Sequence, residues 1–395
     1  PGLGFGAGSK TSGMHPAGQS ASKHNAMPPT CPPFHLRPLP VQAALACLLL
    51  LFAMFSRANP SCAQEERPLS WTSTRSVDEA RVVILPLIPE LTYSALSVTS
   101  MARKGEYLLL LPEDPFQDPL TGEESSQPLV LSLDLAQVAD RTLNPEGPPL
   151  TPKQIPLLGP DPRQIVPGFQ SFEALAVHGG QFYLLARSLR NQTLQSCLLR
   201  AEWEEHGPHL VLQSSPPLCV DSPNLPQGYA YGALLVSNGM LHILPEANGA
   251  NCNLAPTAHS LTPALVPAAS LPFPCLEFRV GDASSPDDEG FFWVLNRLDS
   301  EEREQLSPAV DSLRSQYGTG RTHAHSQEVS RLVAMHMDVH GVTLADLPPL
   351  ELELSFMPPA WEGLELIEHD GSVGLLLATG GSTPFLLGFV PLHSP

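Results

Sequence analysis

A short pattern recurs along this chain and limits the folds open to it. It reads aromatic residue, any residue, small residue, leucine, any residue, apolar residue, and it occurs five times. The copies are Tyr93–Val98, Phe172–Val177, Tyr231–Val236, Phe273–Phe278 and Trp361–Leu366. After each copy come a polar or glycine-containing turn and a second apolar run, at Tyr107–Leu111, Phe182–Leu185, Leu241–Leu244, Phe291–Leu295 and Val373–Leu377. A strand, a turn and a second strand repeated in this way predict a series of β-hairpins.

The composition agrees with a chain of strands and turns. Of 395 residues, 42% are hydrophobic and only 15% are charged, with 44 prolines and 29 glycines. Long surface helices need Glu, Lys and Arg, so they are disfavoured here. The 40 acidic and 21 basic residues give a net charge of −19, which repels phosphate backbones. We therefore expect no nucleic-acid partner, and a small-molecule or protein ligand instead.

Further strands follow most of the hairpins. Third strands are predicted at Leu129–Leu135, Cys197–Trp203, Arg331–Met337 and Phe385–Val390, and fourth strands at Gln154–Leu158 and His209–Gln213. Four short antiparallel strands per repeat are the unit of a β-propeller. We therefore predict an all-β chain with one propeller over residues 81–395 and insertions at about 141–168 and 298–328. Pro308 limits any helix in the second insertion to short pieces.

The two ends of the predicted propeller complement each other. The last repeat lacks a fourth strand, because few residues follow Val390, while the apolar segment Arg81–Ile88 precedes the first repeat and has no hairpin of its own. Pairing this segment with the last repeat would close the ring and protect both strand edges. We predict five blades closed in this way. Six blades, with one degenerate blade in a long interval, and a two-sheet sandwich are the alternatives.

The amino-terminal region predicts export. The uncharged run Val41–Phe55 has the length of a signal-peptide core, and Ser61 and Ala63 suit cleavage after Ala63. We interpret residues 1–26 as translated upstream sequence, 27–63 as a signal peptide and 64–80 as a lead into the propeller. A secreted or periplasmic monomer with no membrane span after cleavage follows. A signal-anchor helix is the alternative.

Four cysteines remain beyond residue 63: Cys197, Cys219, Cys252 and Cys275. An even number of cysteines in an exported chain favours two disulfides, with three pairings open. Buried free thiols are the alternative.

The second position of each repeat should recur at one height around the propeller axis. The residues there are Ser94, Glu173, Gly232, Pro274 and Glu362. Two carboxylates and a hydroxyl around an axis suit a hard cation, so we predict Ca²⁺ bound by Ser94, Glu173 and Glu362. The alternative is that each glutamate accepts hydrogen bonds from backbone N–H groups at the mouth of the channel.

The same motifs carry a resemblance. Phe172-Glu-Ala-Leu-Ala-Val and Trp361-Glu-Gly-Leu-Glu-Leu resemble strands of the phytase-like (esterase-like) extracellular propellers, and are similar to those of the five-bladed soluble calcium-activated nucleotidases. The resemblance implies a calcium-dependent hydrolase of phosphate esters, with Ser94, Glu173 and Glu362 as ligands. Gly232 and Pro274 depart from that pattern, since neither side chain carries an oxygen.

Other motifs are less informative. His323 and His325 could be metal ligands on one strand face, but we interpret them as solvated loop histidines, and the acidic segment 287–289 as a hairpin tip. No GxSxG elbow is present, and arginines that could bind phosphate, such as Arg187, Arg190, Arg200 and Arg297, are scattered along the sequence. Two functions stay open: a phosphoric-ester hydrolase, and a non-catalytic binding module for a protein, glycan or small molecule.

Overall fold

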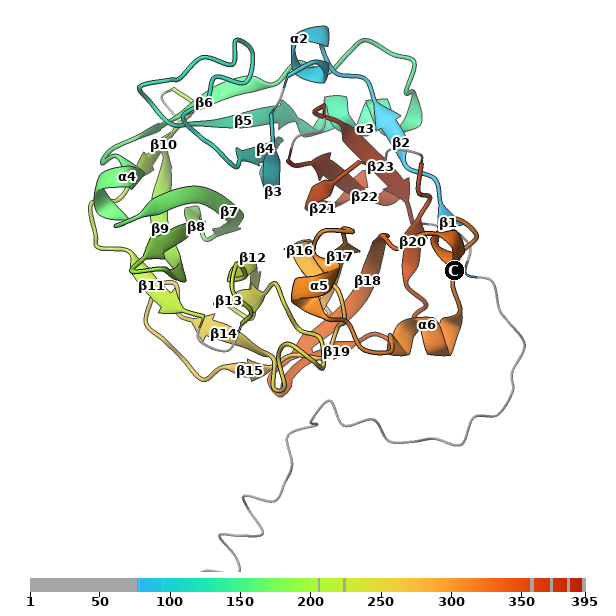
Figure 1. The fold of residues 1–395 in the computed structure, drawn as a ribbon. Helices are drawn as coiled ribbons and strands as arrows, with labels where there is room; N and C mark the ends of the chain where they lie inside the picture. Colours follow the sequence, from blue (N-terminus) through green and yellow to red (C-terminus); the bar gives the residue numbers. More distant parts are fainter. Residues whose placement is uncertain are drawn as a thin grey trace, which may run out of the picture. The chain divides into compact units, whose positions relative to one another are not determined.

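The chain forms a five-bladed β-propeller (Figure 1). The computed structural model describes residue 77 and residues 79–392, with gaps at 95, 205–206, 223–224, 356–358, 370–371 and 382–383. The predicted upstream segment and signal peptide lie outside the described residues, as does nearly all of the predicted lead. The predicted propeller is confirmed with five blades, and the six-bladed and sandwich alternatives are wrong.

Blades one to three follow one another along the chain. Blade one contains β3 (Val98–Lys104), β4 (Tyr107–Pro112), β5 (Leu129–Asp134) and β6 (Lys153–Leu158). Blade two contains β7 (Phe169–His178), β8 (Gln181–Arg190), β9 (Thr193–Glu204) and β10 (His209–Leu212), with β11 (Leu218–Asp221) paired to β9. Blade three contains β12 (Tyr231–Ser237), β13 (Met240–Pro245), β14 (Thr257–Leu261) and β15 (Leu271–Pro272).

Blades four and five complete the ring. Blade four contains β16 (Arg279–Ala283), β17 (Phe291–Leu298), β18 (Val329–Asp338) and β20 (Leu350–Leu352), with β19 (Gly341–Leu344) paired to β18. Blade five contains β21 (Trp361–His369), β22 (Ser372–Thr379), β23 (Leu387–Pro391) and β2 (Val83–Leu85). The innermost strands β3, β7, β12, β16 and β21 lie next to one another in that order, and β21 returns to β3.

The amino-terminal strand closes the ring as predicted. Strand β2 runs antiparallel to β23, with Val83 opposite Phe389. Just before it, the two-residue strand β1 (Glu79–Ala80) pairs in parallel with β20 of blade four. Strands β1 and β2 therefore cover the outer edges of blades four and five. Because β2 serves as the fourth strand of blade five, the last repeat needs no fourth strand of its own.

The helices within the described residues are short and lie between strands. They are α2 (Pro89–Thr92), α3 (Leu135–Leu143), α4 (Pro162–Ile165), α5 (Arg303–Leu306), α6 (Ser312–Tyr317) and the 3₁₀ helix η1 (His323–His325). Pro308 separates α5 from α6, as expected for a residue that cannot continue a helix. None of the helices described has the length and hydropathy needed to cross a bilayer.

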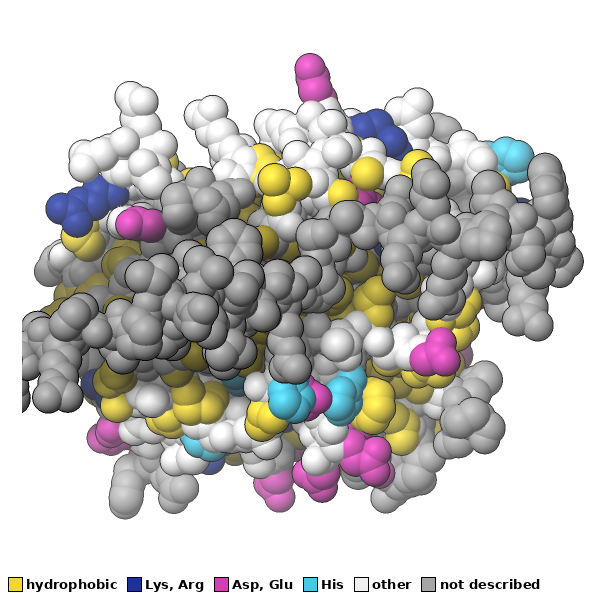
Figure 2. Space-filling view, turned by 90° about the horizontal axis from the view of Figure 1, so that it is seen from below, with side chains coloured by type: hydrophobic (Ala, Val, Ile, Leu, Met, Phe, Trp, Pro, Cys, Tyr) yellow, Lys and Arg dark blue, Asp and Glu magenta, His cyan; other side chains and the backbone are white. Residues whose placement is uncertain are grey.

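The hydrophobic core lies within and between the blades. The run Leu108–Leu111 in β4 is buried throughout, because neighbouring blades cover both faces of the sheet. Continuous apolar runs of this kind are typical of strands buried on both sides. Charged side chains lie on the outside, along the axis and in a buried cluster of blade four that includes Arg331 and Glu351. Figure 2 shows acidic and histidine side chains side by side along one edge of the surface.

Three of the five repeat copies mark the innermost strands correctly. Phe172–Val177 lies in β7, Tyr231–Val236 is in β12, and Trp361–Leu366 is in β21. The other two copies were placed wrongly. Tyr93–Val98 covers the turn after α2 and only the first residue of β3, and Phe273–Phe278 follows β15, the outermost strand of blade three. In blade four the buried acid Asp282 interrupts the apolar pattern, so the true strand does not match it.

One of the two expected disulfides is confirmed. Cys197 of β9 and Cys219 of β11 are bonded, and they lie directly opposite each other in the antiparallel register. The second disulfide would have needed Cys252, whose thiol is free and partly buried. That expectation is therefore wrong for Cys252.

Candidate functional site along the propeller axis

A bulge in each innermost strand sets the geometry of the axis. The ladder with the next strand shifts register between Val98 and Ser100, Phe172 and Ala174, Tyr231 and Ala233, Val280 and Ala283, and Trp361 and Gly363. A bulge leaves one residue unpaired and re-aims its side chain. The unpaired positions are Thr99, Glu173, Gly232, the Gly281–Asp282 pair and Glu362.

The predicted ring of axial residues is therefore correct at three positions and misplaced at two. Glu173, Gly232 and Glu362 occupy equivalent bulges. Ser94 lies in the turn after α2, where its hydroxyl donates to the Leu91 carbonyl at 2.7 Å. Pro274 follows the outer strand β15. Thr99 takes the position expected for Ser94, and donates to the Phe172 carbonyl of the next blade at 3.0 Å.

Glu173 and Glu362 belong to a chain of ion pairs at this end of the axis, which we call the axial ion network. Arg187 of β8 contacts Glu173 at 3.0 Å and Glu246 at 2.9 Å. Glu246 follows β13, and its other oxygen binds Arg279 at 2.8 Å. Charges of opposite sign thus alternate from blade two to blade four.

The network continues into blade five. Arg297 of β17 donates to Glu362 at 2.7 Å and to Asp299 at 3.1 Å, while Arg279 lies 4.0 Å from Glu362 and 3.4 Å from Glu302. Arg187 and Arg297, which are far apart in sequence, are therefore gathered at one place, with Arg279 between them. The interpretation that the arginines are scattered is wrong for these two.

Gly232 makes room for the centre of the network. A Cβ atom at this position would lie 2.7 Å from Cγ of Glu246. Blades two, four and five carry a carboxylate on the bulge itself, whereas in blade three Glu246 supplies it from the end of the neighbouring strand. Only a glycine bulge allows this, because Glu246 is 1% exposed and held by two arginines.

The pKa values of the two neighbouring carboxyl groups, Glu173 and Glu246, are shifted in opposite directions. Burial raises the pKa of Glu173, against the effect of Arg187. Burial also acts on Glu246, but Arg187 and Arg279 together lower the pKa of that carboxyl below its usual value. Arg187 and Arg279 stay charged, because the carboxylates around them raise their pKa.

Deeper along the axis, one acid crosses between blades. Asp282 is fully buried, and it accepts hydrogen bonds from the Ser100 hydroxyl at 3.3 Å and the Leu364 amide at 2.9 Å. The same hydroxyl of Ser100 accepts from the Leu175 amide at 3.2 Å. Burial raises the pKa of Asp282 well above its usual value. This acid therefore links blades one, four and five, and its burial favours the protonated form.

The far end of the innermost strands encloses a cavity of about 240 Å³, which we call the axial cavity. All five blades contribute to its lining, including Met101, Leu175, Leu234, Ala283 and Glu365. Glu365 is not among the residues predicted for a site, although it lies in the same repeat copy as Glu362, because only the second position of each copy was expected at the axis.

Glu365 is the chemically distinctive residue of the axial cavity. It is 1% exposed, and its carboxyl accepts from the Ser285 hydroxyl at 3.1 Å and from the Leu366 amide at 2.9 Å. Arg103 lies 3.6 Å away. Burial raises the pKa of Glu365 to about 7, although Arg103 and these hydrogen bonds act in the opposite direction. A carboxyl group with this pKa can both accept and donate a proton near neutral pH.

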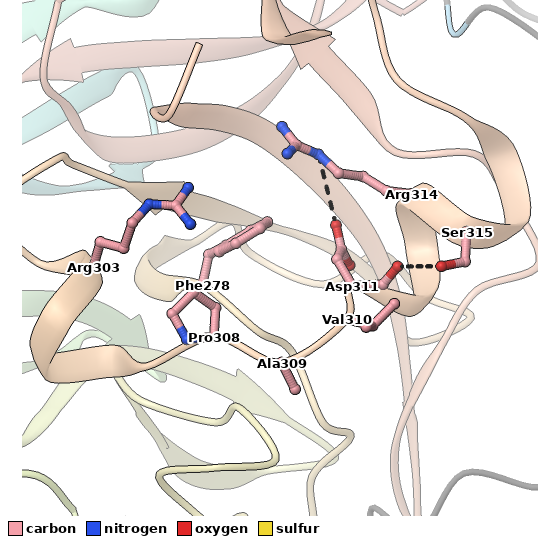
Figure 3. A pocket seen from close by; sticks show the side chains of 8 residues that line it. All are labelled: Phe278, Arg303, Pro308, Ala309, Val310, Asp311, Arg314 and Ser315. Atoms are coloured by element: carbon pink, nitrogen blue, oxygen red, sulfur yellow. Dashed lines mark hydrogen bonds and ion pairs between the residues drawn. The ribbon is translucent and has the colours of Figure 1, made fainter. Parts of the chain in front are cut away.

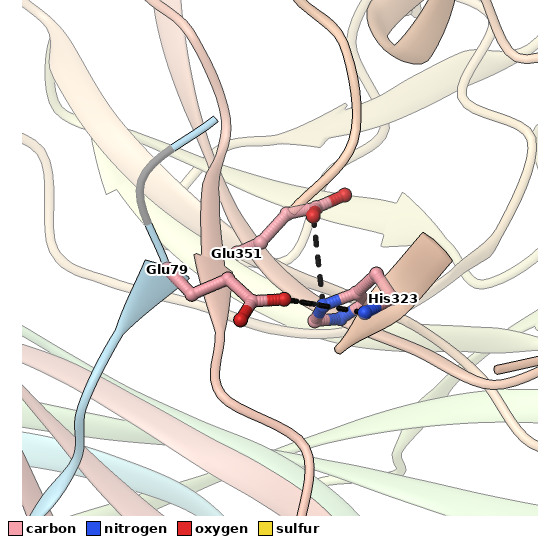
Figure 4. A group of neighbouring side chains, drawn as sticks. All are labelled: Glu79, His323 and Glu351. Carbon is pink, nitrogen blue, oxygen red and sulfur yellow. Dashed lines mark hydrogen bonds and ion pairs between the residues drawn. The ribbon is translucent and has the colours of Figure 1, made fainter. Parts of the chain in front are cut away.

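His323 differs from its predicted place in a solvated loop. It is buried between Glu79 of β1, at 3.1 Å from Nδ1, and Glu351 of β20, at 3.5 Å (Figure 4). His325 is exposed, as expected. The ligand atoms of these three side chains, of which Glu79 is partly buried, lie within 4.8 Å of one another. Hydrogen bonds from the chain already engage Glu79 and both imidazole nitrogens, so the trio acts as a tie between the amino-terminal strand and blade four.

Comparison with known proteins adds a likeness of fold. No protein-family model matches the sequence, and no curated protein is significantly similar to it. Among solved structures, a mutant α-L-arabinanase of Cellvibrio cellulosa aligns at TM-score 0.44 and 13% identity, over 76% of this chain and 93% of its own. A GH43 enzyme of Xanthomonas citri aligns at TM-score 0.43 and 12% identity, over 80% of this chain and 91% of its own.

A third structure aligns less completely. The GH32 β-fructofuranosidase of Bombyx mori, a mutant in complex with sucrose, gives a TM-score of 0.44 at 9% identity, over 76% of this chain and 62% of its own. Likenesses at these identities and TM-scores say nothing about what this chain binds or converts. Its chemistry has to be argued from its own residues.

Proposed function

We propose that the chain is a hydrolase whose reaction takes place in the axial cavity, with Ser285 as nucleophile and Glu365 as general base. The observation that carries the proposal is the 3.1 Å hydrogen bond from the Ser285 hydroxyl to a buried carboxyl whose pKa is about 7. A nucleophile within hydrogen-bond reach of a base, in a cavity, is the arrangement that nucleophilic catalysis requires.

The proposed reaction is ester hydrolysis in two steps. Ser285 Oγ attacks the carbonyl carbon or the phosphorus of the ester, its proton passes to Glu365, and the alcohol leaves with that proton. Water then attacks the ester formed on Ser285, with Glu365 again taking and returning the proton. Arg103, 3.6 Å from the Glu365 carboxyl, would offset the negative charge that develops on the ester oxygen.

The cavity limits the size of the substrate. About 240 Å³ accommodates a small acyl or phosphoryl group and not a polymer segment. Phosphate esters, the class implied by the resemblance to phytase-like propellers, remain one substrate class of this proposal, and carboxylate esters are the other. The positive charge of Arg103 is compatible with both.

A mechanism-based probe tests the nucleophile without knowledge of the substrate. A fluorophosphonate transfers its phosphonyl group to an activated serine and releases fluoride. We expect peptide mass spectrometry to find the adduct on Ser285, and the adduct to be lost in Ser285→Ala. In Glu365→Gln the labelling rate should fall by roughly 10²–10⁴-fold, the usual contribution of a general base.

The pH dependence and a control complete the test. Because Glu365 must be ionised to accept the proton, labelling should rise as the pH increases through about 7. Thr343→Ala, which removes an exposed hydroxyl from β19, should label like the wild type. Absence of an adduct on Ser285, or unchanged labelling in Glu365→Gln, would exclude this mechanism.

The second candidate is a non-catalytic binding module. It is favoured by one observation: the carboxylates of the axial ion network are all engaged by arginines and so hold blades together. In that case the axial cavity would take a small ligand, with Glu365 as the polar anchor. An unlabelled Ser285 together with a ligand-induced rise in melting temperature that Glu365→Gln abolishes would support this candidate.

Calcium is not part of the proposed reaction. Ser94 lies outside the axial positions, and Glu173 and Glu362 each contact an arginine. An ion bound by the two glutamates would have to displace those guanidinium groups. Calcium binding at the axis stays a prediction from the sequence, and these arginine contacts argue against it.

A further inference from the structure

A pocket of about 360 Å³ lies in the insertion of blade four, and shares no lining residue with the axial cavity (Figure 3). Helices α5 and α6 and the segment between them form its wall, over the ring of Phe278. Its lining residues are Phe278, Arg303, Pro308, Ala309, Val310, Asp311, Arg314 and Ser315. Proline, alanine, valine and the phenylalanine ring make most of this surface apolar.

Two arginines enter the pocket from opposite sides. Figure 3 shows the Arg303 and Arg314 side chains ending near the Phe278 ring. The guanidinium carbon of Arg314 lies 5.7 Å from the centre of that ring. Beneath it, Arg331 is fully buried, at 4.8 Å from the same centre. The positive charges of Arg314 and Arg331 therefore both lie close to one aromatic ring.

Two of the nearby carboxylates, Asp311 and Glu277, are engaged by other donors. Asp311 accepts two hydrogen bonds from Arg331, at 2.6 and 3.2 Å, and a third from the Leu313 amide. Glu351 accepts the Gly320 amide through Oε2 at 2.6 Å, whereas its Oε1 accepts no hydrogen bond within the described residues and lies 3.7 Å from Arg314 Nε. Glu277, behind Ala309, accepts backbone N–H groups of Ala250 and Ala309.

The positive charge of Arg314 is only partly balanced by hydrogen bonds and nearby carboxylates. It lies 3.9 Å from Asp311 and 3.7 Å from Glu351, and its Nε and Nη2 donate no hydrogen bond within the described part of the chain. Arg303 donates Nη2 to the neutral Gln327 carbonyl, and its Nε is likewise unbonded. A partly buried guanidinium group without hydrogen-bond acceptors is unfavourable, because it has lost water and gained little in return.

From this arrangement we infer that the blade-four pocket binds a small organic carboxylate with an apolar body. The carboxylate would accept hydrogen bonds from Arg303 and Arg314, which suit planar oxyanions. The apolar body would pack on Phe278 and Pro308. The chain as a whole carries a net charge of −19, but this pocket presents two arginines. It should therefore select a ligand whose oxygen atoms accept the hydrogen bonds that the arginines lack.

The test uses the full chain with benzoate as the probe, followed by isothermal titration calorimetry and by melting temperature. We expect benzoate to bind and to raise the melting temperature, and cyclohexylmethylamine, a cation of similar shape, to do neither. Arg314→Gln and, separately, Arg303→Gln should each weaken benzoate binding by roughly tenfold or more. Arg163→Gln, at a surface ion pair with Asp161, is the matched control and should bind as the wild type does.

Two variants keep the test decisive, since either one alone could disturb the local fold. Loss of affinity in both, with unchanged circular dichroism in at least one, supports the site. Absence of benzoate binding to the wild type, or equal affinity in wild type and both variants, overturns it. Preference for inorganic phosphate over benzoate overturns the assignment of a carboxylate with an apolar body.

Discussion

Ser100 and Asp282 share a hydrogen bond of 3.3 Å across the propeller axis, although 182 positions separate them in the sequence. Both are buried, and Asp282 also accepts the Leu364 amide of blade five. This single acid thus joins three of the five innermost strands. Burial raises the pKa of Asp282 well above its usual value, which favours a neutral carboxyl group in this link.

The replacement Asp282→Asn tests that protonation state. An acid with a raised native pKa holds a proton that the unfolded chain releases, so wild-type stability should fall as the pH rises above about 3.8, the usual pKa of Asp. Asparagine keeps the shape and cannot ionise. We expect Asp282→Asn to be at least as stable as the wild type at neutral pH, with a flatter pH dependence in urea unfolding.

Asp282→Ala is the matched comparison. It leaves the Leu364 amide and the Ser100 hydroxyl without this acceptor, which should cost roughly 1–3 kcal/mol. If asparagine were as destabilising as alanine at neutral pH, the acid would have to be ionised in the native protein, against our assignment.

Removal of Arg187 should destabilise the fold strongly. Arg187→Ala leaves Glu173 and Glu246 facing each other, both buried and without the charge that lies between them. Breaking a buried network from one side typically costs about 3–5 kcal/mol, because an uncompensated charge stays behind. Guanidinium unfolding monitored by tryptophan fluorescence would measure the loss. Arg163→Ala, an exposed arginine, should leave the transition midpoint nearly unchanged.

The glycine bulge of blade three should not tolerate a side chain. In Gly232→Ala the new Cβ would lie 2.7 Å from Glu246 Cγ, and Glu246 cannot move without breaking contacts to Arg187 and Arg279. Overpacking of this kind typically costs about 1–3 kcal/mol. Gly239→Ala, in the open turn before β13, is a comparison with no neighbouring atom within 4 Å, where only backbone strain is expected. Equal losses at both sites would mean that the network yields more easily than its contacts indicate.

The blade count and ring closure were predictable because they depend on local patterns. Apolar runs and turns marked the hairpins. The segment Arg81–Ile88 belonged to no hairpin, and the last repeat was the one that lacked a fourth strand, so pairing the two followed. The axial positions of Glu173, Gly232 and Glu362 were predictable for the same reason, since in these three strands the unpaired residue directly follows the aromatic residue of the repeat.

The partners of those residues were not predictable from spacing. Arg187, Arg279 and Glu246 reach the axis from different blades, and only the closed ring brings them together. Ser94 and Pro274 were misplaced because a six-residue pattern occurs by chance in β-rich sequence. The buried Asp282 obscured the true strand β16, since a charged residue argues against a core position until its partners are known.

The stabilisation that the Glu79 carboxylate provides through its contacts with Thr322 and His323 should depend on pH. Burial by itself would raise the pKa of Glu79, but hydrogen bonds donated by Thr322 and His323 lower it. A carboxyl with a lowered native pKa stabilises the fold above its usual pKa of 4.5, and this contribution is lost as the pH falls through the native value. Glu79→Gln should therefore lower the melting temperature at neutral pH, and the difference from the wild type should shrink in acid.

Glu353→Gln provides the control for that experiment. Glu353 pairs with Arg321 in an exposed ion pair, so its replacement should change little at either pH. A constant difference between Glu79→Gln and the wild type from neutral to acidic pH would contradict the role assigned to the Glu79 carboxylate.

Calcium should not change the stability of the propeller. A cation that binds the native state raises the melting temperature, so a calcium site at the axis would show as a difference between calcium and chelator. Glu173 and Glu362 already contact Arg187 and Arg297 at 3.0 and 2.7 Å, and each guanidinium group repels a second cation. We expect equal melting temperatures in calcium and in chelator for the wild type. A rise with calcium that disappears in both Glu173→Gln and Glu362→Gln would instead establish the metal site predicted from the sequence, with the arginines displaced.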